Sequence, residues 1–189
     1  MQKQRGFTLI ELLIVLAITA ILVMLATPSF KRMTQSSAVS SSVNSFLADL
    51  RYARSEAVRR GGNVVMCRSD NPEAAVPACS GGSGPGNKGW VSGWIIFHDL
   101  SSPVNGTYDA GTDLLLRVQA ATTTPDEITD TPASNKFVFT ATGRLSATSV
   151  ASSMHFGSTA YGTERKLLCV SLGGRGRVAP TGTATCSDV

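Results

Sequence analysis

The sequence predicts an α+β protein in which one long N-terminal helix packs on an antiparallel β-sheet domain. Two observations carry this prediction. The chain is apolar almost without interruption from Phe7 to Ala26, and an amphipathic pattern then continues to Arg60. The remainder is rich in Gly, Ser and Thr with few aromatic residues, which is typical of short strands joined by polar loops. With 189 residues, the chain has room for one such domain and an anchor.

The apolar segment Phe7–Ala26 is long enough to cross a bilayer as a helix. Lys3 and Arg5 precede it, so this end is expected to stay in the cytoplasm. Glu11 interrupts the segment with a carboxylate, which costs roughly 2.5–3.5 kcal/mol at the centre of a membrane. A secretory signal peptide would be shorter and end in small residues, and a plain signal anchor has no use for an acid. Glu11 is therefore the most informative residue of the segment.

The run Gly6–Glu11, Gly-Phe-Thr-Leu-Ile-Glu, resembles the cleavage and methylation motif of the type IV pilin and type II secretion pseudopilin superfamily. The resemblance implies a type IV pilin fold and a prepilin peptidase that cuts after Gly6. It also implies that the new terminus, Phe7, is N-methylated, and that Glu11 pairs with the terminal amine of a neighbouring subunit in a filament. The protein is then expected in the inner membrane as a prepilin, and later in the periplasm or at the cell surface in a pilus.

This resemblance divides the chain into three parts. Residues 1–6 are the cleaved leader, residues 7–28 the hydrophobic anchor and filament-core helix, and residues 29–189 a soluble pilin domain. In that domain an amphipathic helix is expected over about 29–60, because its later apolar residues follow the i, i+3, i+4, i+7 pattern. Residues 63–189 are expected to be β-rich. Loss of the leader leaves 15 basic residues (17 minus 2) against 13 acidic ones, a net charge of +2.

Local signals predict where the helix bends and ends and where strands follow. Pro28 predicts a kink because proline removes a backbone donor, the serine-rich stretch Ser36–Ser42 predicts fraying, and Gly61 predicts the end of the helix. The segments Ser80–Gly89 and Thr122–Asn135 are expected to be connections. The expected strands are Asn63–Arg68, Trp90–His98, Leu114–Gln119, Lys136–Thr140, Ser153–Phe156 and Arg165–Leu172.

Four cysteines, Cys67, Cys79, Cys169 and Cys186, lie outside the apolar segment. None belongs to a CxxC pair and the chain has only two histidines, so no metal site and no cofactor are expected. Two disulfides suit an oxidising compartment. Proximity in sequence favours Cys67–Cys79 and Cys169–Cys186 among the three pairings, and each would contribute about 3 kcal/mol by closing a short loop.

Three further segments, Asp49–Arg60, Cys67–Ser69 and Gly93–Phe97, resemble the FimT, FimU and GspH group of minor pilins and pseudopilins. The resemblance is dense in the anchor and helix and thin across Ser101–Asn135. It implies a minor subunit whose partners are other pilins and minor pilins in a filament. The sequence contains no phosphate-binding Walker motif, metal-ligand spacing or nucleophile elbow, and no enzymatic activity is expected.

The C-terminal segment Leu172–Val178 resembles the Gly-Arg-x-Arg motif of FimT-type minor pilins, which bind DNA during natural transformation. The motif falls on Gly174, Arg175, Gly176 and Arg177. Arginine offers a planar set of donors that matches phosphate oxygens, and flanking glycines allow a phosphate backbone to approach closely. If the segment is extended, both arginines project from the same face.

Charge is unevenly distributed along the chain. Residues 31–60 carry six basic and two acidic side chains, residues 61–131 three and eight, and residues 132–189 six and two. The arginines of the helix are interpreted as solvated or as filament contacts. Three other basic residues could extend a basic surface around the motif if the strands bring them together: Arg144, Arg165 and Lys166.

The leading hypothesis is a minor pilin of a type IV pilus that binds DNA without sequence preference for uptake in natural transformation. Two alternatives stay open. Gly-Gly-Arg-Gly-Arg is also typical of a hairpin turn whose arginines keep a sheet edge soluble. The chain would then be a structural, FimU-like minor pilin that primes assembly or joins tip proteins to the shaft. The other alternative is a GspH-like pseudopilin of a type II secretion system.

Overall fold

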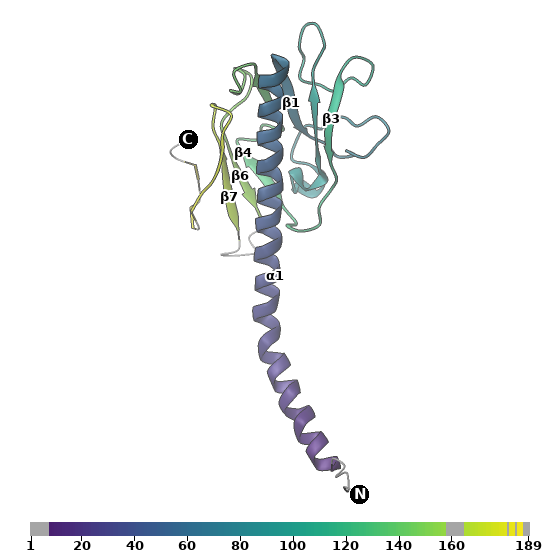
Figure 1. Ribbon diagram of the computed structural model, residues 1–189, viewed down its shortest axis with the longest axis vertical. Helices are drawn as coiled ribbons and strands as arrows, with labels where there is room; N and C mark the ends of the chain where they lie inside the picture. Colours follow the sequence, from purple (N-terminus) through teal and green to yellow (C-terminus); the bar gives the residue numbers. More distant parts are fainter. Residues whose placement is uncertain (1–7, 158–164, 181, 184, 187–189) are drawn as a thin grey trace, which may run out of the picture.

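The computed structural model describes residues 8–157, 165–180, 182–183 and 185–186. One long helix, α1 (Leu9–Arg60), packs with its C-terminal half against two four-stranded antiparallel sheets, and its N-terminal half extends away from them (Figure 1). The predicted fold class is correct. The sequence predicted a single sheet, however, and the structure has two.

Both ends of α1 are capped as its sequence demands. The side-chain oxygen of Thr8 accepts a hydrogen bond from the backbone N–H of Glu11 at 3.3 Å, which satisfies one free donor of the first turn. Gly61 follows the last turn with φ 84°, a left-handed conformation that glycine adopts without strain, and its N–H donates to the carbonyl oxygen of Ala57. The predicted helix end at Gly61 is therefore confirmed.

The interior of α1 differs from the prediction at two places. The helix runs unbroken through Pro28 and curves gently in its N-terminal half, with no sharp kink (Figure 1). It is also helical throughout Ser36–Ser42, so the predicted fraying is wrong. The hydroxyl of Ser40 donates to the carbonyl oxygen of Ser36 at 2.6 Å, so its hydrogen-bond donor finds a partner within the helix.

Burial divides α1 into two halves. By length and composition the helix is apolar enough to cross a membrane. Its side chains from Leu9 to Gln35 are exposed, although many are large and apolar, and the first fully buried position is Val39. From Val39 onward, one face of the helix packs against both sheets. The core of the domain therefore lies entirely beyond the apolar anchor.

The first sheet has the order β3-β2-β1-β5, and α1 packs on its strands β1 and β5. Val65 at its centre lies opposite Phe97 on one neighbour and Val138 on the other. Its four strands are β1 (Gly62–Arg68), β2 (Trp94–His98), β3 (Leu114–Gln119) and β5 (Lys136–Thr140). All four coincide with predicted strands, except that Trp90–Ser92 forms a short 3-10 turn, η2, ahead of β2. A second such turn, η1, spans Pro85–Asn87.

The second sheet has the order β4-β6-β7-β8. Its strands are β4 (Ile128–Thr131), β6 (Ser152–Phe156), β7 (Lys166–Val170) and β8 (Gly176–Val178). The predictions for β6 and β7 are confirmed within two residues. β4 was predicted to be part of a connection, and β8 was not predicted, because both are short, polar or glycine-containing segments that become strands only by pairing with β6 and β7.

One aromatic cluster joins α1 to both sheets. The ring of Phe46 lies edge-on to Trp90, Trp94 and Phe156, with centroids 5.4, 5.1 and 5.7 Å apart. Such edge-to-face pairs add to the energy of burial. Next to them, the buried carboxylate of Asp49 accepts a hydrogen bond from Trp94 Nε1 at 2.8 Å and pairs with Arg117 of β3 at 3.0 Å. The helix is thereby fixed in position over the two sheets.

Both expected disulfides are present, Cys67–Cys79 and Cys169–Cys186. The first ties the long loop after β1 back onto that strand. The second ties the C-terminal segment onto β7, where the backbone N–H of Cys186 also donates to Ser153 Oγ at 3.2 Å. The loop closed by the second bridge therefore contains the turn after β7 and the whole of β8.

Candidate nucleic-acid interface

The Gly-Arg-Gly-Arg motif forms the turn and the return strand of the β7–β8 hairpin. Ser171 begins the turn, and its backbone N–H donates to the carbonyl oxygen of Arg175 at 2.9 Å. The N–H of Gly174 donates back to Ser171 at 2.9 Å. In the ladder that follows, Arg177 lies opposite Cys169. The motif is thus a hairpin turn, as one alternative held, and what its arginines do depends on where they point.

Gly176 determines the direction of both arginines, because it packs directly against α1. A Cβ atom at this position would lie 2.7 Å from Leu47 Cδ1 and 2.9 Å from Leu50 Cδ2. Neighbours in an extended chain face the opposite way. Arg175 and Arg177 therefore both point away from the helix, and both are exposed.

Gly174 brings a second hairpin against the motif. It has φ 71°, and a Cβ there would lie 2.1 Å from the carbonyl oxygen of Gly143, in the turn after β5. A hydrogen bond of 3.0 Å from Leu145 N–H to the Leu172 carbonyl oxygen joins the same two segments. Arg144 lies between the two contacts and is exposed. The structure therefore places this predicted supporting residue beside the motif.

Two arginines of α1 lie on a stripe of the helix that contacts both the motif strand and the turn after β5. Leu47, Arg51, Arg54 and Val58 follow i, i+4, i+7, i+11 spacing and so form one stripe along the helix. Leu47 at one end faces the motif strand β8, as described above. A Cβ on Gly143 would lie 2.9 Å from Arg54 Nε and 3.1 Å from Val58 Cγ2 at the other end.

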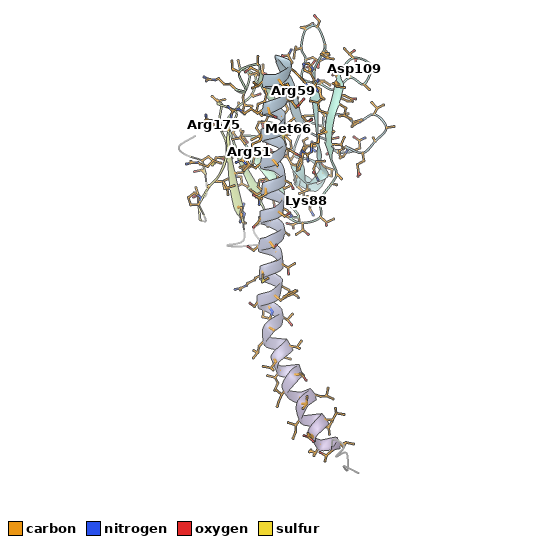
Figure 2. The ribbon with its side chains drawn as sticks, in the orientation of Figure 1. Arg51, Arg59, Met66, Lys88, Asp109 and Arg175 are labelled. Atoms are coloured by element: carbon orange, nitrogen blue, oxygen red, sulfur yellow. A yellow bond between two sulfur atoms is a disulfide. The ribbon has the colours of Figure 1, made fainter. Side chains whose placement is uncertain are left out.

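Arg51 lies between these two contacts along the helix, and Figure 2 shows it on α1, next to the side of the domain that carries Arg175. From the sequence, Arg51 and Arg54 were interpreted as solvated or as filament contacts. Their position beside the motif was not predicted. Their shared helix face was visible in the sequence. Which hairpin meets that face was not, because this depends on contacts between residues about 100 positions apart.

The other two supporting candidates do not join the motif. Lys166 turns inward and donates from Nζ to Ser40 Oγ of α1 at 2.8 Å. Arg165 Nε donates to the carbonyl oxygen of Gly157 at 3.1 Å. Lys166 begins β7 and Arg165 precedes it, three and four residues from Cys169, the position that pairs with Arg177. These separations correspond to about 10 and about 13 Å at roughly 3.3 Å per residue. The expectation that they extend the basic surface is therefore wrong.

We call five residues from three segments the basic cluster: Arg51, Arg54, Arg144, Arg175 and Arg177. Within the part of the chain that the structure describes, none of the five forms an ion pair or a side-chain hydrogen bond. Arg59 and Arg60, one turn further along α1, differ because both bind the carboxylate of Glu56, at 2.5 and 2.7 Å. The cluster consequently keeps its charges free for an external anion.

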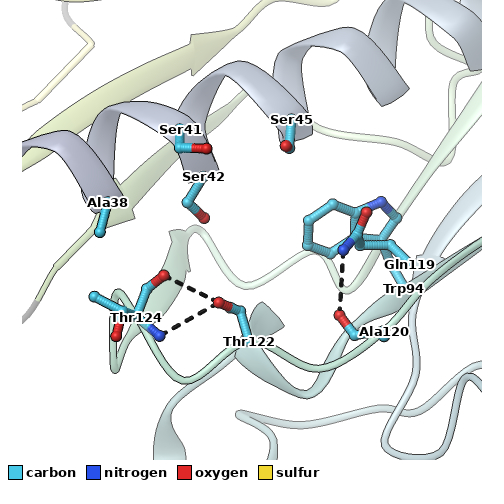
Figure 3. A pocket seen from close by; sticks show the side chains of 9 residues that line it. All are labelled: Ala38, Ser41, Ser42, Ser45, Trp94, Gln119, Ala120, Thr122 and Thr124. Carbon is cyan, nitrogen blue, oxygen red and sulfur yellow. Dashed lines mark hydrogen bonds between the residues drawn. The ribbon is translucent and has the colours of Figure 1, made fainter.

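Of two surface hollows beside α1 in the described part of the chain, one is lined by arginines and the other is not. The hollow next to the basic cluster has a volume of about 390 Å³ and is lined by Arg51, Arg54, Ser55 and Val58. The other, of about 250 Å³, lies between α1 and the segment after β3 (Figure 3). Its lining is Ala38, Ser41, Ser42, Ser45, Trp94, Gln119, Ala120, Thr122 and Thr124. None of these side chains is charged, so the second hollow offers no counter-charge to a phosphate.

The loop between β2 and β3 lies across the helix from the motif and is organised by carboxylates. Figure 2 shows Asp109, in the loop between β2 and β3, across the helix from Arg175. The carboxylates nearby organise that loop: Asp99 accepts from the backbone N–H of Asn105 and Gly106 at 3.0 and 2.6 Å, and Asp113 accepts from that of Asp109 at 2.8 Å. The basic cluster, in contrast, has no carboxylate paired with it in the described part of the chain, and it can therefore attract an anionic polymer.

The architecture defines the class of protein. The helix is exposed and apolar in its first half and packs on antiparallel sheets in its second half, which is the type IV pilin fold. The chain is a type IV minor pilin or pseudopilin. Residues 42–174 match the family described as type II transport protein GspH, and residues 1–27 match the prokaryotic N-terminal methylation motif. The first match covers more than half of the chain, which therefore belongs to the GspH family.

Solved structures agree with this fold. The type IV minor pilin FimU of Pseudomonas aeruginosa superimposes with a TM-score of 0.55 and 23% sequence identity, over 82% of this chain and 95% of that one. A second crystal form of FimU gives a TM-score of 0.50 and 22% identity, over 79% and 95%. At this level of identity the likeness concerns the fold alone. Comparison with curated protein sequences gives no significant match.

The methylation motif and the apolar helix together are those of a membrane-anchored prepilin that is assembled into a pilus. Gly6 and Phe7, the expected cleavage and methylation positions, lie outside the described residues. Glu11 lies in the first turn of α1 with its side chain exposed. A carboxylate there, on an otherwise apolar surface, is available to a partner from another subunit.

Proposed function

We propose that this chain is a minor pilin of a type IV pilus that binds DNA without sequence preference and takes part in DNA uptake during natural transformation. The observation that carries the proposal is the pair Arg175 and Arg177, exposed on the face of a hairpin that points away from α1. Neither has an ion-pair partner among the described residues. Two free guanidinium groups on one face suit the phosphate oxygens of a DNA backbone.

The hairpin also holds these arginines in place before DNA arrives. Its ladder to β7, the contact of Gly176 with α1 and the Cys169–Cys186 bridge all restrict the backbone of the motif. A restricted backbone loses less conformational entropy on binding, which favours affinity. Contacts to phosphate carry no sequence information, so binding is expected at any DNA sequence.

The test of the proposal is the salt dependence of DNA binding by the full chain in uncharged detergent. Each phosphate contact contributes about −0.9 to the slope of log K against log salt on duplex DNA, so Arg175→Ala/Arg177→Ala should make the slope shallower by about 1.8. Fluorescence anisotropy with a labelled duplex at several salt concentrations measures it. The fold should survive, because exposed substitutions usually change stability by no more than about 0.5 kcal/mol.

A matched control removes the same charge from the neighbouring strand of the same hairpin. Arg165→Ala/Lys166→Ala lies at the far end of β7 and should leave the slope unchanged. If this control lowers the slope as much as the motif variant does, binding is diffuse and the motif is not the site. If the wild-type chain binds no DNA even at low salt, the chain is a structural minor pilin of the FimU kind. In cells, the motif variant should still make pili and yet transform poorly.

The same proposal requires processing by a prepilin peptidase at the inner membrane before assembly. We expect cleavage between Gly6 and Phe7, and methylation of the new amino group on Phe7. Mass spectrometry of the mature N-terminus measures both modifications at once. An intact leader in assembled filaments contradicts the assignment, whereas Gly6 replaced by a bulky residue should leave the prepilin uncut.

The two disulfides should differ in their effect on DNA binding. Cys169→Ser/Cys186→Ser opens the loop that contains the motif, whereas Cys67→Ser/Cys79→Ser opens a loop on the other sheet. Each change should reduce the free energy of unfolding by about 3 kcal/mol. Only the first should also weaken DNA binding, because only that bridge encloses the arginines. If the two folded variants bind DNA with equal affinity below their melting temperatures, the second bridge does not contribute to the DNA-binding site.

A further inference from the structure

We propose that Arg51 and Arg54 of α1 form a second phosphate-binding pair, so that one DNA duplex contacts the helix and the hairpin together. The inference rests on the proposed function, because it extends the same binding surface. It names two residues that neither the motif nor the family resemblance indicates. The ligand chemistry is that of a phosphodiester backbone.

The first argument is position. The contacts of Gly176 with Leu47 and of Gly143 with Arg54 hold the stripe of α1 that carries both arginines against the motif and the β5 turn. Arg51 and Arg54 are three residues apart, so their Cα atoms are separated by about 4.5 Å along the helix axis. They therefore project from neighbouring turns of one helix face.

The second argument is the arrangement around the edge strand. β8 is the last strand of its sheet, and no further strand pairs with it among the described residues. Gly176 of this strand faces α1, whereas Arg175 and Arg177 face the other way. The helix arginines thus lie on one side of the open edge and the motif arginines on the other. A duplex has two phosphate backbones and can contact both sides at once.

The third argument is electrostatic. The five arginines of the basic cluster come from three segments that contact one another, and no carboxylate pairs with any of them in the described part of the chain. Unpaired charges of one sign attract an anion to this part of the surface. On the same helix, Arg59 and Arg60 are neutralised within the protein, because both form an ion pair with Glu56. Arg51 and Arg54 instead line a hollow of about 390 Å³ that is open to solvent.

The test compares two variants with the same change in charge on the same helix, in the full chain in uncharged detergent. Arg51→Ala/Arg54→Ala should make the slope of log K against log salt shallower by about 1.8, as two lost phosphate contacts require. The control, Lys31→Ala/Arg32→Ala, removes two charges from exposed positions nearer the N-terminus of α1. These positions lie about 28 Å from Arg51 along the helix axis, at roughly 1.5 Å per residue. The control should therefore leave the slope unchanged. Arg51→Lys/Arg54→Lys should restore most of the slope because the charges return.

The outcomes separate this inference from the proposed function. If the motif variant flattens the slope and the helix variant does not, the hairpin binds DNA by itself and the inference is wrong while the function stands. If both variants flatten it, both stand. If the helix variant changes the slope of log K against log salt no more than Lys31→Ala/Arg32→Ala does, the position of the two arginines does not matter and the inference fails. Unaltered melting temperatures of the helix variants show that the fold is intact, so a lower slope then reports lost contacts.

Discussion

Glu11→Leu should lower incorporation into filaments by more than a hundredfold while the protein still inserts into the membrane. Removal of the carboxylate favours insertion, because a charge in the apolar segment costs roughly 2.5–3.5 kcal/mol. In the filament we expect Glu11 to pair with the terminal amine of a neighbouring subunit, as the resemblance to pilins implies. Loss of one partner from a buried ion pair leaves the other unpaired at a cost of about 3–5 kcal/mol. Immunoblots of sheared pili and of membranes measure the two pools separately.

Two controls distinguish charge from apolar packing at this position. Glu11→Gln keeps the shape of the side chain and removes its charge, so it should fail in assembly as Glu11→Leu does. Thr19→Leu makes the anchor more apolar without touching the carboxylate, since the Thr19 hydroxyl donates to the carbonyl oxygens of Val15 and Leu16, at 2.5 and 3.1 Å. It should assemble normally. Wild-type amounts of Glu11→Leu in filaments would remove Glu11 from the assembly mechanism.

Gly174→Ala should reduce the free energy of unfolding by about 2–4 kcal/mol. A Cβ here would lie 2.1 Å from a backbone oxygen of Gly143, so the two hairpins must move apart, and overpacking of this kind costs about 1–3 kcal/mol. The left-handed φ of 71° adds roughly 1 kcal/mol for any residue with a Cβ. Chemical denaturation measures the loss. DNA affinity should also fall, because the shift separates Arg175 from Arg144 and from the helix arginines.

The neighbouring glycine is a matched control. A Cβ on Gly173 would have only Ser171 Oγ nearby, at 3.6 Å, which is an ordinary contact. Gly173→Ala should therefore change stability by no more than about 0.5 kcal/mol and leave DNA binding as it is. If the two alanine variants unfold at the same denaturant concentration, the hairpins are not held together through Gly174, and the basic cluster is not assembled by this contact.

Local features of the chain were predictable because they depend on residues close in sequence. The anchor helix follows from an unbroken apolar run, the end of α1 from Gly61, and the disulfides from short spacings. Strands with many apolar residues, such as β1 and β2, were also predicted, since burial on both faces leaves a continuous apolar run. The motif itself could be located, because Gly174–Arg177 is a contiguous segment.

The sequence alone thus determined the class of protein, the anchor, the helix and the motif, all of which are written in contiguous residues. Only the tertiary structure decided which cations surround the motif. It brought Arg144 and the α1 pair Arg51 and Arg54 to the hairpin, and it directed Lys166 to Ser40 instead. It also formed β4 and β8, whose residues have weak strand preferences of their own. The physical reason is the same throughout: these placements depend on side-chain packing and strand pairing between distant segments, and no local pattern encodes which distant segment will be the neighbour.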